Sequence, residues 1–312
     1  MDDFTLTIIG SGAALPLHGR HPSAQVVQYH NVCCLVDCGE GTQERLKPAG
    51  VKAFRINFIL ISHLHGDHVF GLPGLMSSLT HLGRTEKLTI YGPAGIKGFL
   101  ESIMKFSEMR ISYPLDIIET TPMDVTRLII TDQFEILTFP LYHRIACNGY
   151  LFRETKEQVH MKKEQVMAYQ LAPAQIQALQ RGEAIEYKGD KIPAHIFFEV
   201  PSAPVSYAYC SDTRFDQRLI ASIKGVSVLF HETTFMNDRS ALALETGHST
   251  TGDAGRIAVQ AGTSCLMTGH YSSRYADISP LIRETEEQFP YVVQAEEGKK
   301  YNLRSLSARI NP

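Results

Sequence analysis

One short stretch, Ser62-His63-Leu64-His65-Gly66-Asp67-His68, brings together three imidazoles and a carboxylate. It follows an apolar, β-branched run over 56–61, which is typical of a buried strand. After it, residues 70–79 have the pattern of a helix entered through Gly71-Leu72-Pro73-Gly74. We therefore expect these side chains on a strand-to-helix loop, where a rigid scaffold can direct them at a ligand.

The spacing within this loop predicts a site for metal ions. His63 and His65 are two residues apart, so in extended backbone both rings point to the same side. Asp67 and His68 follow where the chain turns and can face a second point. The loop could therefore supply two ligands to each of two ions. Imidazole and carboxylate suit Zn²⁺, with Mn²⁺ or Fe²⁺ as alternatives. A surface loop that merely happens to be rich in histidine is the weaker explanation.

Two metal ions need more ligands than one loop can give, and His143, Asp212 and His270 are the further candidates. Taken alone, each is explained as well by a histidine that packs in the core or by an aspartate in a turn. Taken together, in order along the chain and each after an apolar strand, they favour a functional site.

The composition is that of an ordinary globular protein. Of 312 residues, 44% are hydrophobic and 20% are charged, and the net charge is −3. A protein that binds nucleic acid over a broad face is usually basic, so any RNA contact must come from a local patch or from bound divalent ions. The six cysteines include no Cys-x-x-Cys pair and indicate no disulfide framework. With no apolar run of membrane-spanning length and no signal peptide, we expect a cytoplasmic protein without membrane contact.

Strand patterns alternate with helix patterns along most of the chain, which favours a layered α/β fold. We predict strands over 4–9, 23–29, 33–36, 56–61, 88–91, 116–118, 128–130, 135–140, 196–200, 205–210, 226–230 and 264–267. We predict helices over 42–46, 70–79, 95–104, 252–261 and 280–289. Ser249 or Thr250 would cap the helix over 252–261, with Asp253 in its first turn.

Residues 154–191 break this alternation. The segment is rich in lysine, glutamate and glutamine, and Pro173 and Gly182 would bound a helix within it. On composition alone, a solvated surface insertion explains the segment best.

The loop over 62–68 resembles the signature loop of the metallo-β-lactamase superfamily, and its extension over 70–75 resembles the ribonuclease Z branch. Later stretches resemble further motifs of that branch: Cys147-Asn148-Gly149-Tyr150 after His143, Ser211-Asp212-Thr213-Arg214 with serine in place of glycine, His231-Glu232-Thr233-Thr234, His248-Ser249-Thr250 and His270-Tyr271-Ser272-Ser273-Arg274-Tyr275. The resemblance implies a four-layer αβ/βα metallo-β-lactamase sandwich. Residues 1–312 would form one domain, with 154–191 inserted as an exosite-like arm.

The resemblance also implies a ligand set for two Zn²⁺ ions per subunit. One ion would be bound by His63, His65 and His143, the other by Asp67, His68 and His270, with Asp212 bridging. Asp37 would brace the histidine loop, although a turn aspartate before glycine explains that residue almost as well.

The implied chemistry is metal-assisted hydrolysis of a phosphodiester, in which Asp67 orients the attacking hydroxide. His248, steadied by Glu232, would protonate the leaving oxygen, since a carboxylate that orients an imidazole makes a competent acid–base pair. With a transfer-RNA precursor as substrate, the products would be a 3′-hydroxyl on the RNA and a 5′-phosphate on the trailer.

The resemblance implies an endonuclease that removes 3′ trailers from transfer-RNA precursors, with Arg20 and Arg274 as substrate-binding residues. The first loop departs from the branch's Pro-x-Lys-x-Arg-Asn, with His18 and His21 in place of lysine and asparagine, and the insertion carries no Gly-Pro motif. A hydrolase of small phosphodiesters or other esters is therefore an alternative, and a non-catalytic RNA-binding protein is a weaker one. By resemblance we expect a homodimer in which one subunit's arm serves its partner's active site.

Overall fold

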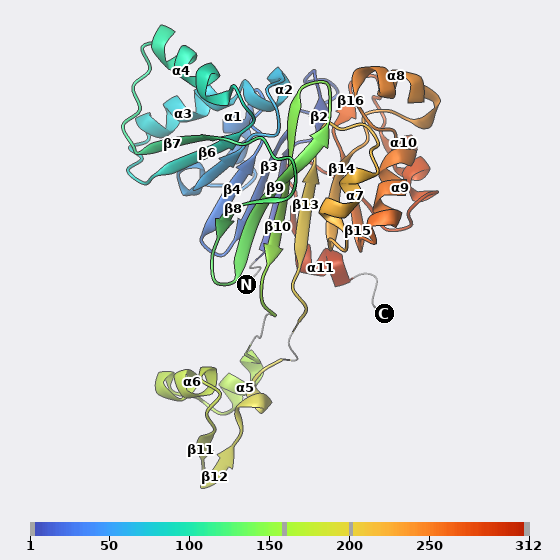
Figure 1. Cartoon of the computed structure of the whole chain (residues 1–312). Coiled ribbons are helices and arrows are strands. Elements are labelled where there is room, and N and C mark those ends of the chain that lie inside the picture. The colour runs from blue at the N-terminus through green and yellow to red at the C-terminus, as the bar shows by residue number, and fades with distance from the viewer. Residues whose placement is uncertain (1–3, 158–160, 200–201, 309–312) are drawn as a thin grey trace. The chain divides into compact units, whose positions relative to one another are not determined.

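The computed structural model describes residues 4–157, 161–199 and 202–308 (Figure 1). Its contacts divide the chain into two compact units, one formed by Met1–Arg153 with Val205–Pro312 and the other by Glu154–Pro204. The second unit extends past 191, where the predicted insertion ends, and the description of 1–312 as one domain with an arm stays a prediction. No helix in the described ranges is long and apolar enough to cross a membrane.

The first sheet of the larger unit combines an antiparallel part with a parallel part. Its strands are β1 (Phe4–Gly10), β3 (Ala24–Tyr29), β4 (Val32–Val36), β5 (Phe58–Leu60), β6 (Leu88–Gly92), β7 (Leu115–Glu119) and β18 (Lys300–Asn302). In the described part of the chain their order is β18-β1-β3-β4-β5-β6-β7. The strands predicted over 23–29 and 33–36 form an antiparallel hairpin of β3 and β4, and β4 to β7 run parallel.

The second sheet is also mixed. Its strands are β8 (Thr126–Ile130), β9 (Phe134–Tyr142), β10 (Ala146–Glu154), β13 (Ser206–Cys210), β14 (Val228–Glu232), β15 (Cys265–Gly269) and β17 (Val292–Gln294). Their order, again for the described residues, is β17-β15-β14-β13-β10-β9-β8, with β13, β14, β15 and β17 parallel. A separate short pair joins β2 (Gly12–Ala13) to β16 (Tyr271–Ser272).

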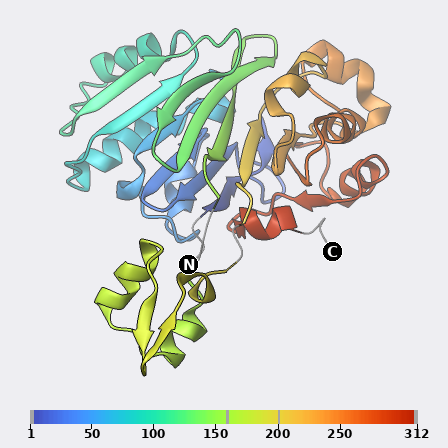
Figure 2. The same cartoon turned by 60° about the horizontal axis from the view of Figure 1, so that its bottom comes forward.

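Helices cover the outer faces of the two sheets (Figures 1 and 2). The helices of the larger unit are α1 (Thr42–Leu46), α2 (Gly66–Val69), α3 (Leu72–His81), α4 (Ile96–Phe106), α7 (Arg218–Ile223), α8 (Ser240–Thr246), α9 (Thr251–Ala261), α10 (Ser279–Glu286) and α11 (Leu303–Ser307), with 3₁₀ turns at Ala53–Arg55 and Asn237–Arg239. One apolar core fills the space between the sheets and two others lie beneath the helices. The predicted four-layer αβ/βα arrangement is therefore confirmed.

The start of α9 forms as predicted and fixes the segment before it. The Thr250 side chain accepts a hydrogen bond from the Asp253 backbone N–H, and the Asp253 carboxylate accepts one from the Thr250 N–H. Such a cap contributes about 1 kcal/mol to stability. Because His248 lies two residues before this cap, the helix start also limits where its ring can lie.

The second unit has a small core of its own, formed by Leu179, Ile185 and Phe197. Its elements are α5 (Lys163–Ala168), α6 (Pro173–Gln180), β11 (Ile185–Tyr187), β12 (Asp190–Ile192) and a 3₁₀ turn at Ala194–Phe197. The helix predicted to begin at Pro173 is confirmed. The strand predicted over 196–200 is wrong, because a helical turn after Pro193 buries Phe197 in this core; Val200 lies outside the described residues.

Candidate metal centre

The predicted ligands lie at strand ends and on the loops that follow them. Asp37 follows β4, His63 follows β5, His143 follows β9, Asp212 follows β13 and His270 follows β15. Loops at the carboxyl ends of parallel strands are the usual place for ligand sites in α/β folds. Asp67 and His68 were predicted on a loop, but they lie on the short helix α2, which begins at Gly66.

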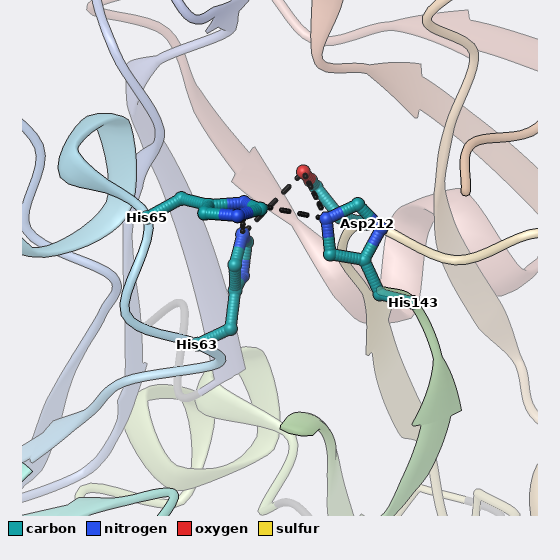
Figure 3. Close-up of side chains that lie close together, drawn as sticks. All are labelled: His63, His65, His143 and Asp212. Carbon is teal, nitrogen blue, oxygen red and sulfur yellow. Dashed lines mark hydrogen bonds and ion pairs between the residues drawn. The ribbon is translucent and has the colours of Figure 1, made fainter. Parts of the chain in front are cut away.

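His63, His65, His143 and Asp212 point their donor atoms toward one another (Figure 3). Nδ1 of His65 lies 3.0 Å from Nε2 of His63 and 3.3 Å from Nε2 of His143. Oδ2 of Asp212 lies 3.5 Å from Nε2 of His63 and 3.9 Å from Nε2 of His143. Donor atoms from separate strand ends thus converge within 4.8 Å of one another.

Asp67, His68 and His270 form a second donor group. The Nε2 atoms of His68 and His270 lie 3.3 Å apart, and Oδ2 of Asp67 lies 3.6 Å from each of them. Oδ1 of Asp212 lies 3.4 Å from Nε2 of His68 and 3.1 Å from Nε2 of His270. The carboxylate of Asp212 therefore directs one oxygen at each donor group.

Asp37 contacts the loop that it is predicted to brace. Its carboxylate accepts hydrogen bonds from the backbone N–H of Ser62 at 2.7 Å, the Ser62 hydroxyl at 2.8 Å and the Tyr209 hydroxyl at 2.7 Å. It also accepts one from Nδ1 of His68 at 2.7 Å. With the proton of a neutral ring on Nδ1, the Nε2 of His68 presents a lone pair to the second donor group.

Partners on the outer ring nitrogens orient other histidines in the same way. Nδ1 of His143 donates to the carbonyl oxygen of Gly247 at 2.7 Å. Nδ1 of His270 lies 2.9 Å from Oγ1 of Thr234, whose hydroxyl donates to Glu232. Lone pairs of neutral rings therefore face one another, and only a cation between them makes this arrangement favourable. The donor set fits divalent metal ions, which bind neutral imidazole and ionised carboxylate.

The buried groups of this centre shift one another's pKa values. Burial raises the pKa of Asp212, but His270 and His68 outweigh it and hold that pKa well below its usual range. Burial, aided by His63, lowers the pKa of His65 to about 4. Burial also lowers the pKa of His68, but Asp212 and the other nearby carboxylates outweigh it and raise that pKa. At His68 a metal ion and a proton therefore compete for the same negative charge.

His248 lies beside these donor groups and is paired with Glu232. Its Nδ1 is 3.0 Å from Oε1 of Glu232 and 3.8 Å from Oδ2 of Asp212. Together with Asp212 and His270, it also makes a third possible donor group. Burial lowers the pKa of His248, but Glu232 and Asp212 outweigh it and raise that pKa to about 9. The Glu232 carboxylate therefore holds the ring and favours its protonated form.

Sequence reasoning missed several polar groups that hold the centre together. The backbone N–H groups of Thr213 and Thr234 donate to Glu232 at 2.8 and 3.3 Å. The backbone N–H of Ala14 donates to Oδ2 of Asp67 at 2.7 Å. Thr234 stands in the same short motif as Glu232 and could have been found there. Nothing in the sequence marks Ala14, because its role depends on a left-handed backbone with φ of 57°.

A pocket of about 320 Å³ lies over the donor groups. Its lining residues are Ala13, Ala14, His65, Asp67, Arg144, Asp212, Thr234, Phe235, Thr246, His248, His270, Ser272, Ser273 and Arg274. The predicted substrate-binding residue Arg274 is among them, exposed to solvent, with its guanidinium 5.9 Å from the ring centre of Phe235. An anion that enters this pocket can therefore reach a cationic side chain and the donor groups together.

Arg20, the other predicted substrate-binding residue, contacts the loop that carries Arg274. Its guanidinium donates to carbonyl oxygens of Ser272, Tyr275 and Ala276. Nε2 of His18 lies 3.0 Å from the carbonyl oxygen of Ser273. The first loop therefore packs against residues 272–276, and Arg20 is not among the residues that line the pocket.

Comparison with known proteins gives four findings of similarity. The family described as anti-Pycsar protein Apyc1 matches residues 4–143. A ribonuclease Z from Parabacteroides distasonis is 38% identical, over 97% of this chain and 100% of its own length. The solved structure of human tRNase Z, short form, is 25% identical with a TM-score of 0.70, covering 96% of this chain and 99% of that one. The metallo-β-lactamase fold protein YhfI from Bacillus subtilis shares the fold at 20% identity, with a TM-score of 0.66 and coverage of 96% and 98%.

Replacement of Asp212 by alanine should remove most of the bound metal, because each donor group then loses an anionic oxygen. Metal content measured by elemental mass spectrometry after gel filtration should fall to less than half that of the wild type. Asp216→Ala, on the same loop but outside both donor groups, is the matched control and should keep its metal. Full metal content in Asp212→Ala would contradict a shared role for this carboxylate.

Proposed function

Because this chain belongs to the ribonuclease Z family and shares the metallo-β-lactamase fold, we propose that it is an endonuclease that removes 3′ trailers from transfer-RNA precursors. One observation carries the proposal. The buried Asp212 directs one oxygen at each of two donor groups, in a chain 38% identical to a ribonuclease Z over 97% of its length.

The proposed cofactors are two Zn²⁺ ions per subunit, with Mn²⁺ or Fe²⁺ as alternatives. His63, His65 and His143 would bind one ion, Asp67, His68 and His270 the other, and Asp212 both. The lone pairs that face one another within each group support this assignment. When bound, such ions supply Lewis-acid activation of a water molecule and of the phosphoryl group.

Asp67 orients the attacking water. Its carboxylate lines the pocket, and the N–H of Ala14 fixes the direction of Oδ2. Burial raises the pKa of Asp67, but His68 and His270 outweigh it and hold that pKa well below its usual range. Asp67 is therefore ionised and available as a hydrogen-bond acceptor at neutral pH.

His248 is the proton donor, and Glu232 is the positioning residue that keeps it protonated. As the bond between phosphorus and the 3′-oxygen breaks, that oxygen takes the proton of His248 and becomes a 3′-hydroxyl. The phosphate stays on the trailer as its 5′-phosphate. After the reaction, the neutral imidazole regains a proton from solvent because Glu232 raises its pKa.

Arg274 contacts the phosphate chain of the substrate, and Arg20 acts through it. The hydrogen bonds of Arg20 to residues 272–276 hold the loop on which Arg274 lies. The guanidinium of Arg274 is exposed at the pocket, where it can form paired hydrogen bonds to a phosphate.

Hydrolysis of small phosphodiesters on the same site is the second candidate function. The lysines and arginine of the second unit are interspersed with glutamates, and Arg181 already pairs with Glu183 at 2.7 Å, which weakens its attraction for RNA. The match of residues 4–143 to the Apyc1 family also shows that similarity is not confined to ribonucleases Z. Both candidates use the same donor groups, so substrate choice is decided elsewhere.

The proposed location is the cytoplasm, and the proposed assembly is a homodimer. The support is the resemblance of 154–191 to an inserted arm that serves the active site of a second subunit. Such an arrangement would give the substrate two contact surfaces without requiring a basic charge over the whole chain.

The pH dependence of precursor cleavage should reveal His248 as the acid. A donor must be protonated, so kcat/KM should fall as the pH rises through the pKa of His248, which is about 9. Glu232→Gln removes the carboxylate that raises this pKa, and the alkaline decline should move to lower pH by about 1–3 pH units. His81→Gln, an exposed histidine on α3, is the control. An unshifted profile in Glu232→Gln would refute the pairing.

Cleavage of a 3′-extended transfer-RNA precursor beside bis(p-nitrophenyl) phosphate tests the proposed function, with the metal content of the sample known. We expect cutting at the discriminator nucleotide with a 3′-hydroxyl product, and loss of both activities in Asp212→Ala. Diester hydrolysis with an intact precursor would contradict the endonuclease and favour the second candidate.

Light scattering tests the proposed homodimer. The expected mass is twice the chain mass of 34.8 kDa. A mass of one chain at micromolar concentration would refute the dimer and leave the assignment of the metal centre unchanged.

A further inference from the structure

Arg144 is a cationic side chain of the pocket that none of the assignments above uses. It follows His143 directly, is exposed, and lines the pocket. Among the residues that the structure describes, its guanidinium has no hydrogen-bond or ion-pair partner. An exposed arginine over a pocket built for phosphodiesters, with no protein carboxylate to neutralise it, is available to an anion from solution.

The stem of Arg144 packs against the turn that carries His248. Gly247 ends α8 with a left-handed backbone, at φ of 75°, and its carbonyl oxygen accepts the Nδ1 hydrogen bond of His143. A Cβ atom added to Gly247 would lie 3.1 Å from Cγ of Arg144 and 3.0 Å from Nδ1 of His143. Glycine therefore allows the arginine stem and the turn to approach closely, which places Arg144 beside the proton donor.

The other arginines near the pocket already contact protein groups. Arg20 donates to carbonyl oxygens of residues 272–276. Arg274 lies over the ring of Phe235, and its Nη1 is 3.5 Å from Oγ of Ser272. Arg144 is thus the pocket arginine whose charge is least engaged by the protein itself.

We infer that Arg144 forms a subsite for the phosphodiester immediately 5′ of the nucleoside that leaves with the 3′-hydroxyl. The inference rests on the proposed function, in which His248 protonates the 3′-oxygen of that nucleoside. Because the stem of Arg144 contacts Gly247, the residue before His248, Arg144 is assigned to the leaving side of the scissile bond. The nearest anion there is the next phosphate of the RNA, which the planar guanidinium can bind through two parallel hydrogen bonds.

The subsite distinguishes a polynucleotide from a small diester. Bis(p-nitrophenyl) phosphate has one phosphate, which occupies the reacting position and leaves the subsite without a ligand. A polynucleotide fills both positions. Arg144 would therefore add affinity for RNA without changing the chemistry at the scissile phosphorus.

The first experiment compares Arg144→Gln and Arg144→Lys with Arg110→Gln, an exposed arginine that does not line the pocket. Arg144→Gln should lower kcat/KM for the precursor about tenfold, mainly through KM, and Arg144→Lys should lower it less. The slope of log kcat/KM against log salt should decrease by about 0.7 in magnitude, the value for one phosphate contact on a single strand. Metal content, turnover of bis(p-nitrophenyl) phosphate and the Arg110→Gln control should match the wild type.

The second experiment locates the phosphate with precursors that carry one neutral methylphosphonate. The substitution on the 5′ side of the leaving nucleoside should slow the wild type about as much as Arg144→Gln does, and it should add no further loss in that variant. If the loss from Arg144→Gln is instead non-additive with a methylphosphonate at the next phosphate on the trailer side of the scissile phosphate, the assigned side is wrong.

The outcomes separate this inference from the proposed function. If the wild type cleaves the precursor and Arg144→Gln cleaves it equally well, the subsite is refuted and the function stands. If Arg144→Gln loses diester and precursor turnover to the same extent, Arg144 supports the metal centre instead, and the subsite is again refuted. If the wild type leaves the precursor intact, the proposed function fails and the subsite with it.

Discussion

The buried carboxylate of Asp212 is the constraint on which the rest of the molecule depends. It is 2% exposed and faces histidine nitrogens with both of its oxygens. An uncompensated charge in such a position costs roughly several kcal/mol, so positive partners must be brought to it from distant parts of the chain. The strand ends of two sheets supply them. The sandwich therefore does more than bury apolar surface: it holds opposite charges together where water is largely excluded.

The backbone around the centre shows what this convergence requires. Asp37 and His270 both adopt left-handed conformations, with φ of 56° and 57°, which non-glycine residues rarely do. Each such residue costs of the order of 1–3 kcal/mol, and it persists because hydrogen bonds fix its side chain. Gly39 and Gly71 allow another close approach, since a Cβ on Gly71 would lie 2.1 Å from the carbonyl oxygen of Gly39. The histidine loop and the Asp37 loop are thus packed backbone against backbone.

The side chains that select a substrate lie around this centre and are more exposed than its donor groups. The donor groups are buried or half-buried and are oriented by protein partners, whereas Arg144 and Arg274 are exposed. Buried groups of this type determine the reaction, because their charges and orientations are fixed before substrate arrives. Exposed arginines determine which phosphate chain is held over them. The same reaction could therefore serve different phosphodiesters after changes to a few residues of the pocket lining.

The sequence by itself determined most of the layered fold and the candidate ligands. Alternating strand and helix patterns predict which faces are buried. The spacing of His63, His65, Asp67 and His68 predicts a loop that can offer donor atoms in two directions. The cap of α9 was equally visible, because a capping residue and its partner lie three positions apart.

Only the tertiary structure decided how distant loops meet. Arg20 contacts carbonyl groups more than 250 residues away, Ala14 donates to Asp67, and Phe197 is buried by a helical turn where the pattern predicted a strand. The reason is physical: periodicity and motif spacing describe neighbours along the chain, whereas these contacts depend on the packing of loops whose backbone directions no local pattern encodes. The orientation of Asp212 toward both donor groups and the free guanidinium of Arg144 also depend on the tertiary structure. Each follows from where other segments place their atoms.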